Sequence, residues 1–220
     1  DLQVFGDTRL DQLHEQSVKT ALKVASEMVV AYRSKNPETG NIEPINTDDV
    51  MFALIHHSTS RALDPQRHTH AILPNMALVN GKARAITIDA MYEKDLYLYL
   101  GYIYQLEMNK GAIELGYQTH KVEVEGKSNN QPMYDLAEIP QSVIQQFSKR
   151  RNQVLEAAKE YGLDAKSSKD IAALVSRNPK DYKSLAVIQD LWQKAFDKIE
   201  AKGIDRKSTR LNSSHQIISY

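Results

Sequence analysis

The chain has 220 residues and no formal net charge, because 28 basic side chains balance 28 acidic ones. This length suffices for one domain with a sizeable core, and neutrality gives no bulk electrostatic sign of nucleic-acid binding. No apolar run approaches the roughly 20 residues that cross a bilayer, so we expect no membrane insertion. The chain has no Cys, which excludes disulfides and thiolates and leaves histidines and carboxylates as ligands for any metal.

The first part of the chain predicts a helix, a loop and a strand. Apolar residues recur at helical spacing from Asp7 to about Tyr32, and breakers at residues 34–40 predict the loop. Val50–Ile55 is a short apolar run, typical of a strand buried on both faces. Ser58–Arg67 is mostly polar and contains a Pro, so it predicts a second loop.

The following residues predict a hairpin, a second long helix and a helical end. His70–Val79 is strand-like, and Asn80-Gly81 after it favours a type I′ β-hairpin. Helical spacing returns from Glu93 to about Leu115, and Gly116 ends that helix. The order of elements predicts an α+β fold in which an antiparallel β-sheet is covered by helices. The remaining predicted elements are strands at Tyr117–Val124 and Met133–Ile139 and helices at about 141–160, 167–176 and 184–202.

The segment from His57 to His70 carries the candidate chemistry. On a helix, His68 and His70 would point about 200° apart, whereas on a strand they share one face. His57 ends the preceding predicted strand, and antiparallel pairing across the loop would place it beside the other two. Three imidazoles around one divalent ion, with positions left open, is a catalytic arrangement. Spacing alone leaves two alternatives: an incidental His-x-His pair, and His56 as the third ligand.

The string H-x-T-S-R-x-x-D-P-Q-x-H-T-H at residues 57–70 resembles the three-histidine motif of conjugative relaxases of the TrwC/TraI (MobF) type. These belong to the wider group of His-hydrophobe-His single-strand endonucleases. The family's spacing selects His57, His68 and His70 as ligands and leaves His56 out. Thr69 departs from the large hydrophobe of the wider group but is usual in these relaxases. Weaker landmarks follow the family's order: Gly6-Asp7-x-Arg9-Leu10 with His14, Leu115-Gly116-Tyr117, Phe147-Ser148-Lys149-Arg150, and Ala172-Ala173-Leu174 with Ser176, Arg177 and Lys180.

The resemblance implies a mechanism. In this family a tyrosine attacks one phosphodiester of single-stranded DNA at a plasmid transfer origin, giving a 5′-phosphotyrosine and a free 3′ hydroxyl. A divalent ion, Mg²⁺ or Mn²⁺ with Zn²⁺ as an alternative, polarises the scissile phosphate, and a second-shell acid orients one histidine. The partners implied are that DNA and the conjugative secretion machinery, in the bacterial cytoplasm. The candidate DNA contacts are Arg61, Arg150, Arg177 and Lys180.

Two segments of the chain carry further expectations. The family's nucleophilic tyrosines and second-shell aspartate are expected upstream of Asp1, so residues 1–204 are interpreted as a partial relaxase domain that is inactive alone. The tyrosines at 97, 99, 102 and 104 fall on a predicted helix, where packing is the expected role. Residues 205–220 resemble the conceptual translation of a sequencing adapter, in which DRKSTRLNSSH followed by ISY recurs, and they are interpreted as a non-native tail.

Two other function classes compete with the relaxase. A three-histidine metal-dependent hydrolase would use the ion to activate water, but it needs a general base and the sequence has no HExxH motif. A non-catalytic DNA-binding scaffold is the third class. A phosphotyrosine adduct separates the relaxase from both.

Overall fold

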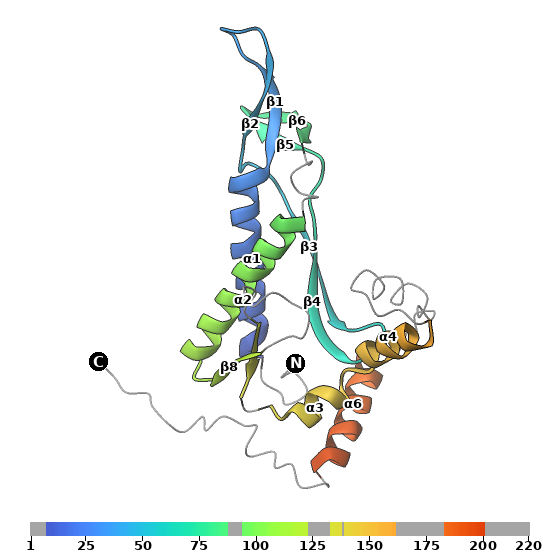
Figure 1. The fold of residues 1–220 in the computed structure, drawn as a ribbon. Helices are drawn as coiled ribbons and strands as arrows, with labels where there is room; N and C mark the ends of the chain where they lie inside the picture. Colours follow the sequence, from blue (N-terminus) through green and yellow to red (C-terminus); the bar gives the residue numbers. More distant parts are fainter. Residues whose placement is uncertain (1–7, 88–93, 123–132, 138, 162–182, 201–220) are drawn as a thin grey trace, which may run out of the picture.

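The structure is a computed structural model, and it describes residues 8–87, 94–122, 133–137, 139–161 and 183–200 (Figure 1). Helices and antiparallel strands alternate along the chain, so the predicted α+β class is confirmed. The helices are α1 (Arg9–Val29), α2 (Lys94–Glu114), α3 (Gln141–Gln146), α4 (Lys149–Glu160) and α6 (Leu185–Glu200). The strands are β1 (Ala31–Lys35), β2 (Ile42–Asn46), β3 (Ala53–Thr59), β4 (Pro65–Ile72), β5 (Ala77–Val79), β6 (Lys82–Arg84), β7 (Ile86–Thr87), β8 (Thr119–Val122) and β9 (Met133–Leu136).

The two long helices, α1 and α2, pack side by side (Figure 1). Both were predicted from apolar spacing, and their bounds lie within three residues of the predicted ones. A Cβ added at Gly111 would lie 2.1 Å from the Leu13 side chain, so this glycine lets the helices approach closely. Gly116, at φ +91°, ends α2 as predicted.

The strands pair as antiparallel ribbons rather than as one continuous sheet. β3 pairs with β4, β5 with β6 and β8 with β9, while β1 lies between β2 and β7. The predicted Asn80-Gly81 turn joins β5 to β6 with both residues in the left-handed region, at φ +51° and +72°, as a type I′ turn requires. In Figure 1 the β3–β4 ribbon curves past the helix pair and ends near α4.

Several predicted boundaries were wrong. The expected loop at residues 34–40 is the turn of the β1–β2 hairpin, where the Asn36 carboxamide accepts hydrogen bonds from two backbone N–H groups. The Ser58–Arg67 loop is shorter than predicted, because β3 and β4 extend into both of its ends. The predicted helix at 141–160 is two helices, α3 and α4, separated at Phe147-Ser148. The predicted helix at 167–176 lies outside the described residues.

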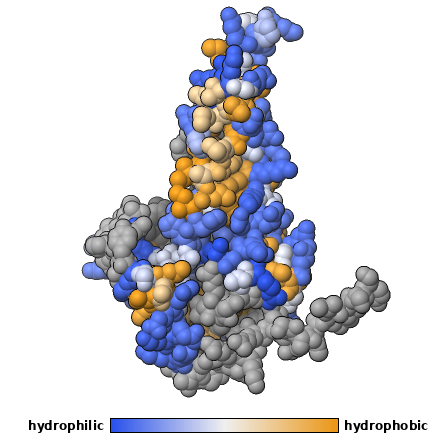
Figure 2. Space-filling view, turned by 180° about the vertical axis from the view of Figure 1, so that it is seen from behind, coloured by the Kyte–Doolittle hydropathy of each residue, from blue (hydrophilic) through white to orange (hydrophobic). Residues whose placement is uncertain are grey.

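One face of the β3–β4 ribbon is open and partly apolar. Figure 2 shows apolar side chains gathered along one side of the molecule. Ile55 and Ile72 are 47% and 50% exposed, and the ribbon register places both on the face that carries His70. Among the described residues, no helix is long and apolar enough to cross a membrane.

Candidate metal centre

The β3–β4 ribbon brings the three selected histidines together. His57 pairs directly with His68 across the ribbon, and His70 lies two residues along the same face of β4. The ring centroids are 5.1 Å apart for His57 and His68, 5.0 Å for His57 and His70, and 5.2 Å for His68 and His70. One ring nitrogen from each residue lies within 4.8 Å of the other two. The antiparallel pairing expected from the sequence therefore makes the rings converge on one point.

The donor set suits a divalent cation. Nitrogens bound at about 2.0–2.1 Å to one tetrahedral ion lie about 3.3 Å apart, which small side-chain rotations reach from the observed spacing. The Nδ1 of His68 donates to the backbone carbonyl of Gln66 at 3.1 Å, because a carbonyl can only accept. This bond fixes the tautomer and leaves Nε2 as the ligand atom. In the part of the chain that the structure describes, the cluster consists of imidazoles alone. Because histidine binds a metal as a neutral ring, such a set of ligands preserves the charge of the ion.

His56 belongs to the other face of the ribbon. Its Nδ1 lies 2.9 Å from the Thr69 hydroxyl oxygen, and Thr69 is the residue between His68 and His70. Because neighbours on a strand point to opposite faces, this contact separates His56 from the three clustered rings. The geometry therefore favours His57 over His56 as the third ligand.

A buried hydrogen-bonded chain lies behind the cluster. His14 on α1 is 6% exposed, with Nδ1 at 2.7 Å from the Tyr104 hydroxyl of α2 and Nε2 at 2.8 Å from the Thr69 hydroxyl. Burial raises the pKa of Tyr104 to about 12 and lowers the pKa of His14 below 6.5. Tyr104 therefore stays protonated beside a neutral His14, and the contacts run on from His14 through the Thr69 hydroxyl to His56, with the direction of each bond set by the His14 tautomer. We refer to Tyr104, His14 and Thr69 as the buried chain.

The turn between β3 and β4 is held from two sides. The Asp64 carboxylate, 2% exposed, accepts hydrogen bonds from the Ser60 hydroxyl at 3.3 Å and the Arg150 backbone N–H at 3.1 Å. Leu63 adopts φ +60°, a left-handed conformation uncommon for a non-glycine residue, and its carbonyl accepts a hydrogen bond from the Trp192 indole N–H at 2.7 Å. Contacts from α4 and α6 thus fix the turn that leads into the histidine strand.

Burial raises the pKa of the Asp64 carboxyl, and the Arg150 and Lys149 contacts oppose that rise. Lys149 lies 3.8 Å from the second carboxylate oxygen. Asp64 also acts as a cap for α4, since Ser148 at the N-cap position makes no side-chain cap hydrogen bond. Sequence reasoning did not assign this role to Asp64.

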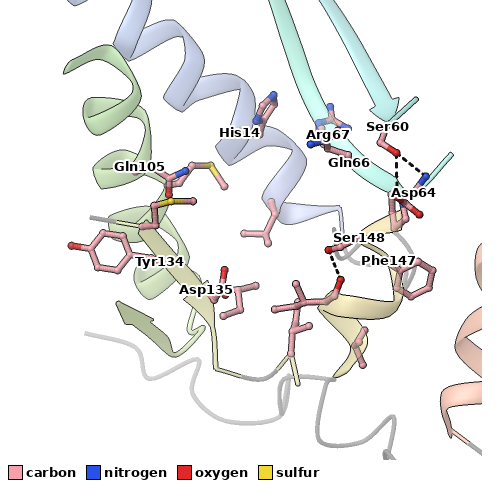
Figure 3. A pocket seen from close by; sticks show the side chains of 18 of the residues that line it. His14, Ser60, Asp64, Gln66, Arg67, Gln105, Tyr134, Asp135, Phe147 and Ser148 are labelled. Carbon is pink, nitrogen blue, oxygen red and sulfur yellow. Dashed lines mark hydrogen bonds between the residues drawn. The ribbon is translucent and has the colours of Figure 1, made fainter. Parts of the chain in front are cut away.

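A cavity of about 960 Å³ lies on the α1 side of β4 (Figure 3). It is bordered by α1, α2, β9, α3 and α4 and by the β3–β4 turn. Arg67 and Asp11, both on its wall, form an ion pair at 2.9 Å, and His14 lines the same space. The cavity and the three clustered histidines are therefore associated with opposite faces of β4.

The candidate DNA contacts are only partly described. Arg61 is exposed on the β3–β4 turn, and Arg150 lies in the first turn of α4, where its backbone binds Asp64. The Arg150 guanidinium also donates to Gln153 at 3.4 Å. Arg61 shares the turn with Asp64, and the Arg150 backbone contacts Asp64, whereas Arg177 and Lys180 lie outside the described residues.

Known proteins share this fold. Solved structures of the conjugative relaxase TrwC in complex with oriT DNA superimpose with a TM-score of 0.78 at 29–30% identity. The match covers 93% of this chain and 70% of the TrwC chain bound to mutant oriT DNA, or 68% of a metal-bound TrwC chain. A copper-bound TrwC complex matches at 30% identity and the same TM-score, covering 93% of this chain and 67% of that one. The fold is that of a conjugative relaxase domain.

Sequence relatives agree with the structural match. Residues 2–199 match the profile of the TrwC relaxase family, and the chain belongs to that family. The multifunctional conjugation protein TraI of Escherichia coli is 31% identical over 214 residues, covering 93% of this chain. TraI of Escherichia coli strain K12 is 31% identical over 206 residues. The chain spans 11% of the length of each TraI protein.

Proposed function

We propose that this chain supplies the metal-binding part of a conjugative relaxase that nicks and rejoins single-stranded DNA at a plasmid transfer origin. The observation that carries the proposal is the convergence of His57, His68 and His70 on one face of a ribbon within a relaxase fold. The ion, when bound, polarises the scissile phosphate and stabilises charge on its oxygens. The chain's own part is to hold three neutral imidazoles on an open face that DNA can reach.

The described tyrosines are poor candidates for the nucleophile. Tyr104 is bonded to His14, and its raised pKa of about 12 opposes formation of a phenolate. The buried chain places α1 and α2 against the Thr69 face of β4, which is opposite to the clustered histidines. We therefore propose that the attacking tyrosine is none of those on α2. Tyr97, Tyr99 and Tyr102 are 55%, 45% and 36% exposed, so the packing role expected from the sequence is wrong for these three.

The metal site is tested first by ion binding. Titration calorimetry with Mn²⁺ should show one site per chain, and each of His57→Ala, His68→Ala and His70→Ala should weaken binding by about tenfold or more. His120→Ala is the matched control, since His120 is exposed on β8 away from the cluster. His56→Ala should change the affinity less than twofold, and losses as large as those of His57→Ala would mean that the ligand set is wrong.

The strand-transfer reaction is tested by a chimera. The segment of TrwC that carries its nucleophilic tyrosines is joined ahead of this chain and incubated with a transfer-origin oligonucleotide and Mg²⁺ or Mn²⁺. We expect a covalent protein–DNA adduct that forms only while the three histidines are intact. An adduct that persists in the triple-alanine chimera would contradict a role for this site, and water-derived cleavage without an adduct would favour the three-histidine hydrolase.

The remaining assignments are proposals that follow from the family. Arg61, Arg150, Arg177 and Lys180 are proposed to contact DNA phosphates, so each substitution to Ala should lower the salt dependence of oligonucleotide binding. The choice of Mg²⁺ or Mn²⁺, the conjugative secretion machinery as a partner, and a cytoplasmic location also rest on the family alone. We further propose that residues 205–220, which lie outside the described residues, are a non-native tail.

A further inference from the structure

The face of the β3–β4 ribbon opposite the three histidines has a separate role, and this role depends on the proposed metal site. We propose that the buried chain of Tyr104, His14 and Thr69 is a positioning device that orients β4, so that His68 and His70 present their rings to the ion. The supporting observation is the Thr69 hydroxyl. Thr69 lies between His68 and His70 in the sequence, and its hydroxyl contacts His14 of α1, which in turn contacts Tyr104 of α2.

The ribbon by itself is a weak support for a metal site. β3 and β4 form a two-stranded sheet, which is at best marginally stable alone. Its register shifts between His57 and Thr59, so the ladder is irregular beside the first ligand. His70 is exposed, and His57 and His68 are only partly buried, so among the described residues little packing restrains the rings from their own side. The contacts that orient β4 must therefore lie on its other face, which carries Thr69.

Thr69 is the residue best placed to give that orientation. Rotation of β4 about its axis moves the side chains at 68, 69 and 70 together, because the backbone links them rigidly. The Thr69 hydroxyl lies 2.8 Å from Nε2 of His14, and this contact fixes the rotation against α1. His14 is in turn fixed by the Tyr104 hydroxyl at 2.7 Å and by edge-on packing of the two rings at 5.6 Å.

The hydrogen bonds among Tyr104, His14 and Thr69 require a hydroxyl at position 69. A large hydrophobe at position 69 would orient the strand by packing alone, but it would leave the buried His14 nitrogen without its hydrogen-bond partner. An unsatisfied buried polar group destabilises the folded state. A Ser at position 69 keeps the hydroxyl, whereas a Val keeps the shape and loses it. This pair of substitutions isolates the hydrogen bond.

The test measures metal affinity and strand order separately in the full chain. Co²⁺ binding, followed by its visible absorption and by calorimetry, should weaken about three- to tenfold in Thr69→Val and change less than twofold in Thr69→Ser. Tyr104→Phe removes only one hydroxyl and should weaken binding about twofold. Ser17→Ala is the matched control, because Ser17 is a fully buried hydroxyl on α1, the helix of His14, and among the described residues it donates to the Leu13 carbonyl alone.

A double-mutant cycle tests whether His14 acts through Thr69. The loss of Co²⁺ affinity in His14→Phe combined with Thr69→Val should be no larger than in Thr69→Val alone. Additive losses, an unchanged affinity in Thr69→Val, or an equal loss in Ser17→Ala would each overturn the proposal. If Thr69→Val fails to fold, amide exchange of residues 67–71 in Tyr104→Phe decides: faster exchange than in the parent chain supports the proposal, and unchanged exchange overturns it.

Failure of the metal site itself is distinguishable. Amide hydrogen exchange of residues 67–71 in the metal-free chain should be faster in Thr69→Val than in the parent chain and unchanged in Ser17→Ala. Absence of Co²⁺ binding in the parent chain together with this exchange pattern would reject the metal site while retaining the orienting role. Unchanged exchange in Thr69→Val would reject the orienting role whatever the metal result.

Discussion

Replacing Asp64 tests how the β3–β4 turn is tied to the C-terminal helices. The carboxylate is 2% exposed and receives one hydrogen bond from Ser60 and one from the Arg150 backbone N–H. Hydrogen bonds to a charged acceptor contribute about 1.5 kcal/mol each, which gives roughly 3 kcal/mol for the pair. Burial opposes the charge, as the raised pKa of Asp64 shows, so we expect Asp64→Ala to cost nearer to 2 kcal/mol.

Asp64→Asn separates the hydrogen bonds from the charge. The carboxamide oxygen can still accept from Arg150, and the buried negative charge is gone, so we expect a loss of less than about 1 kcal/mol. Asp135→Ala is the matched control, since Asp135 accepts a single exposed hydrogen bond from Gln141 at 3.2 Å. Removing that exposed contact should cost at most about 0.5 kcal/mol.

Urea unfolding, followed by circular dichroism, measures these differences. With an m-value of about 2 kcal/mol/M, Asp64→Ala should lower the midpoint by about 1 M, and Asp64→Asn by less than about 0.5 M. Equal midpoints for the two variants would refute the capping argument, because the hydrogen-bonding acceptor would then not matter. An Asp64→Asn variant less stable than Asp64→Ala would show that the charge itself is required.

Three further predictions follow from other parts of the chain. The pKa of His14 lies below its unfolded value near 6.5, so its contribution is full above that pH and is lost as the pH falls toward the folded pKa. Urea midpoints from pH 7.5 to 5.5 should therefore fall less steeply in His14→Phe than in the parent chain; parallel profiles would contradict the assignment. Deleting residues 206–220 should leave the melting temperature unchanged within error, and a clear drop would show that the tail is native structure. Incubating the unmodified chain with transfer-origin DNA and Mn²⁺ should give no covalent adduct, and an adduct mapped by mass spectrometry to a tyrosine of α2 would reject the proposal that none of those tyrosines is the nucleophile.

The long helices were the most predictable part of the fold. Both helices are 21 residues long. On α1 the apolar residues gather on one face, whereas on α2 they are spread around the helix, so its predicted end relied on Gly116. The β1–β2 hairpin was missed because its strands are five residues long and mostly exposed, so they show little apolar alternation. Its turn residues were recognised, but breakers alone do not distinguish a hairpin turn from a loop between other elements.

The convergence of the histidines could be anticipated because the strand period is strict. His68 and His70 share a face on any strand, and the Asn80-Gly81 turn independently favoured strands in this region. The choice between His56 and His57 could not be made from spacing, since it depends on a one-residue register that long-range pairing sets. The family motif favoured His57, and the contact of His56 with Thr69 places His56 on the other face.

The hydrogen bonds on the other face of β4, which support the metal site, were much harder to predict. His14 sits among apolar residues at helical spacing, which marks it as facing the core, but its partners Tyr104 and Thr69 are 90 and 55 residues away. Hydrogen bonds over such separations depend on how α1, α2 and β4 pack. A polar residue on an apolar helix face therefore indicates that it has a buried hydrogen-bond partner, but it does not identify that partner.

Several other residues of the histidine motif have structural roles. Ser60 and Asp64 bond each other and build the turn, Pro65 opens β4, and the carbonyl of Gln66 holds the Nδ1 proton of His68. The weaker landmarks pair in space as well: Arg9 donates to the Tyr117 hydroxyl at 3.0 Å, and the Arg150 backbone bonds Asp64. Only three positions of the motif are proposed ligands. Ser60, Asp64, Pro65 and Gln66 shape and anchor the strand. Substitutions there should lower stability as well as metal affinity, whereas substitutions of the exposed ligand His70 should lower metal affinity alone.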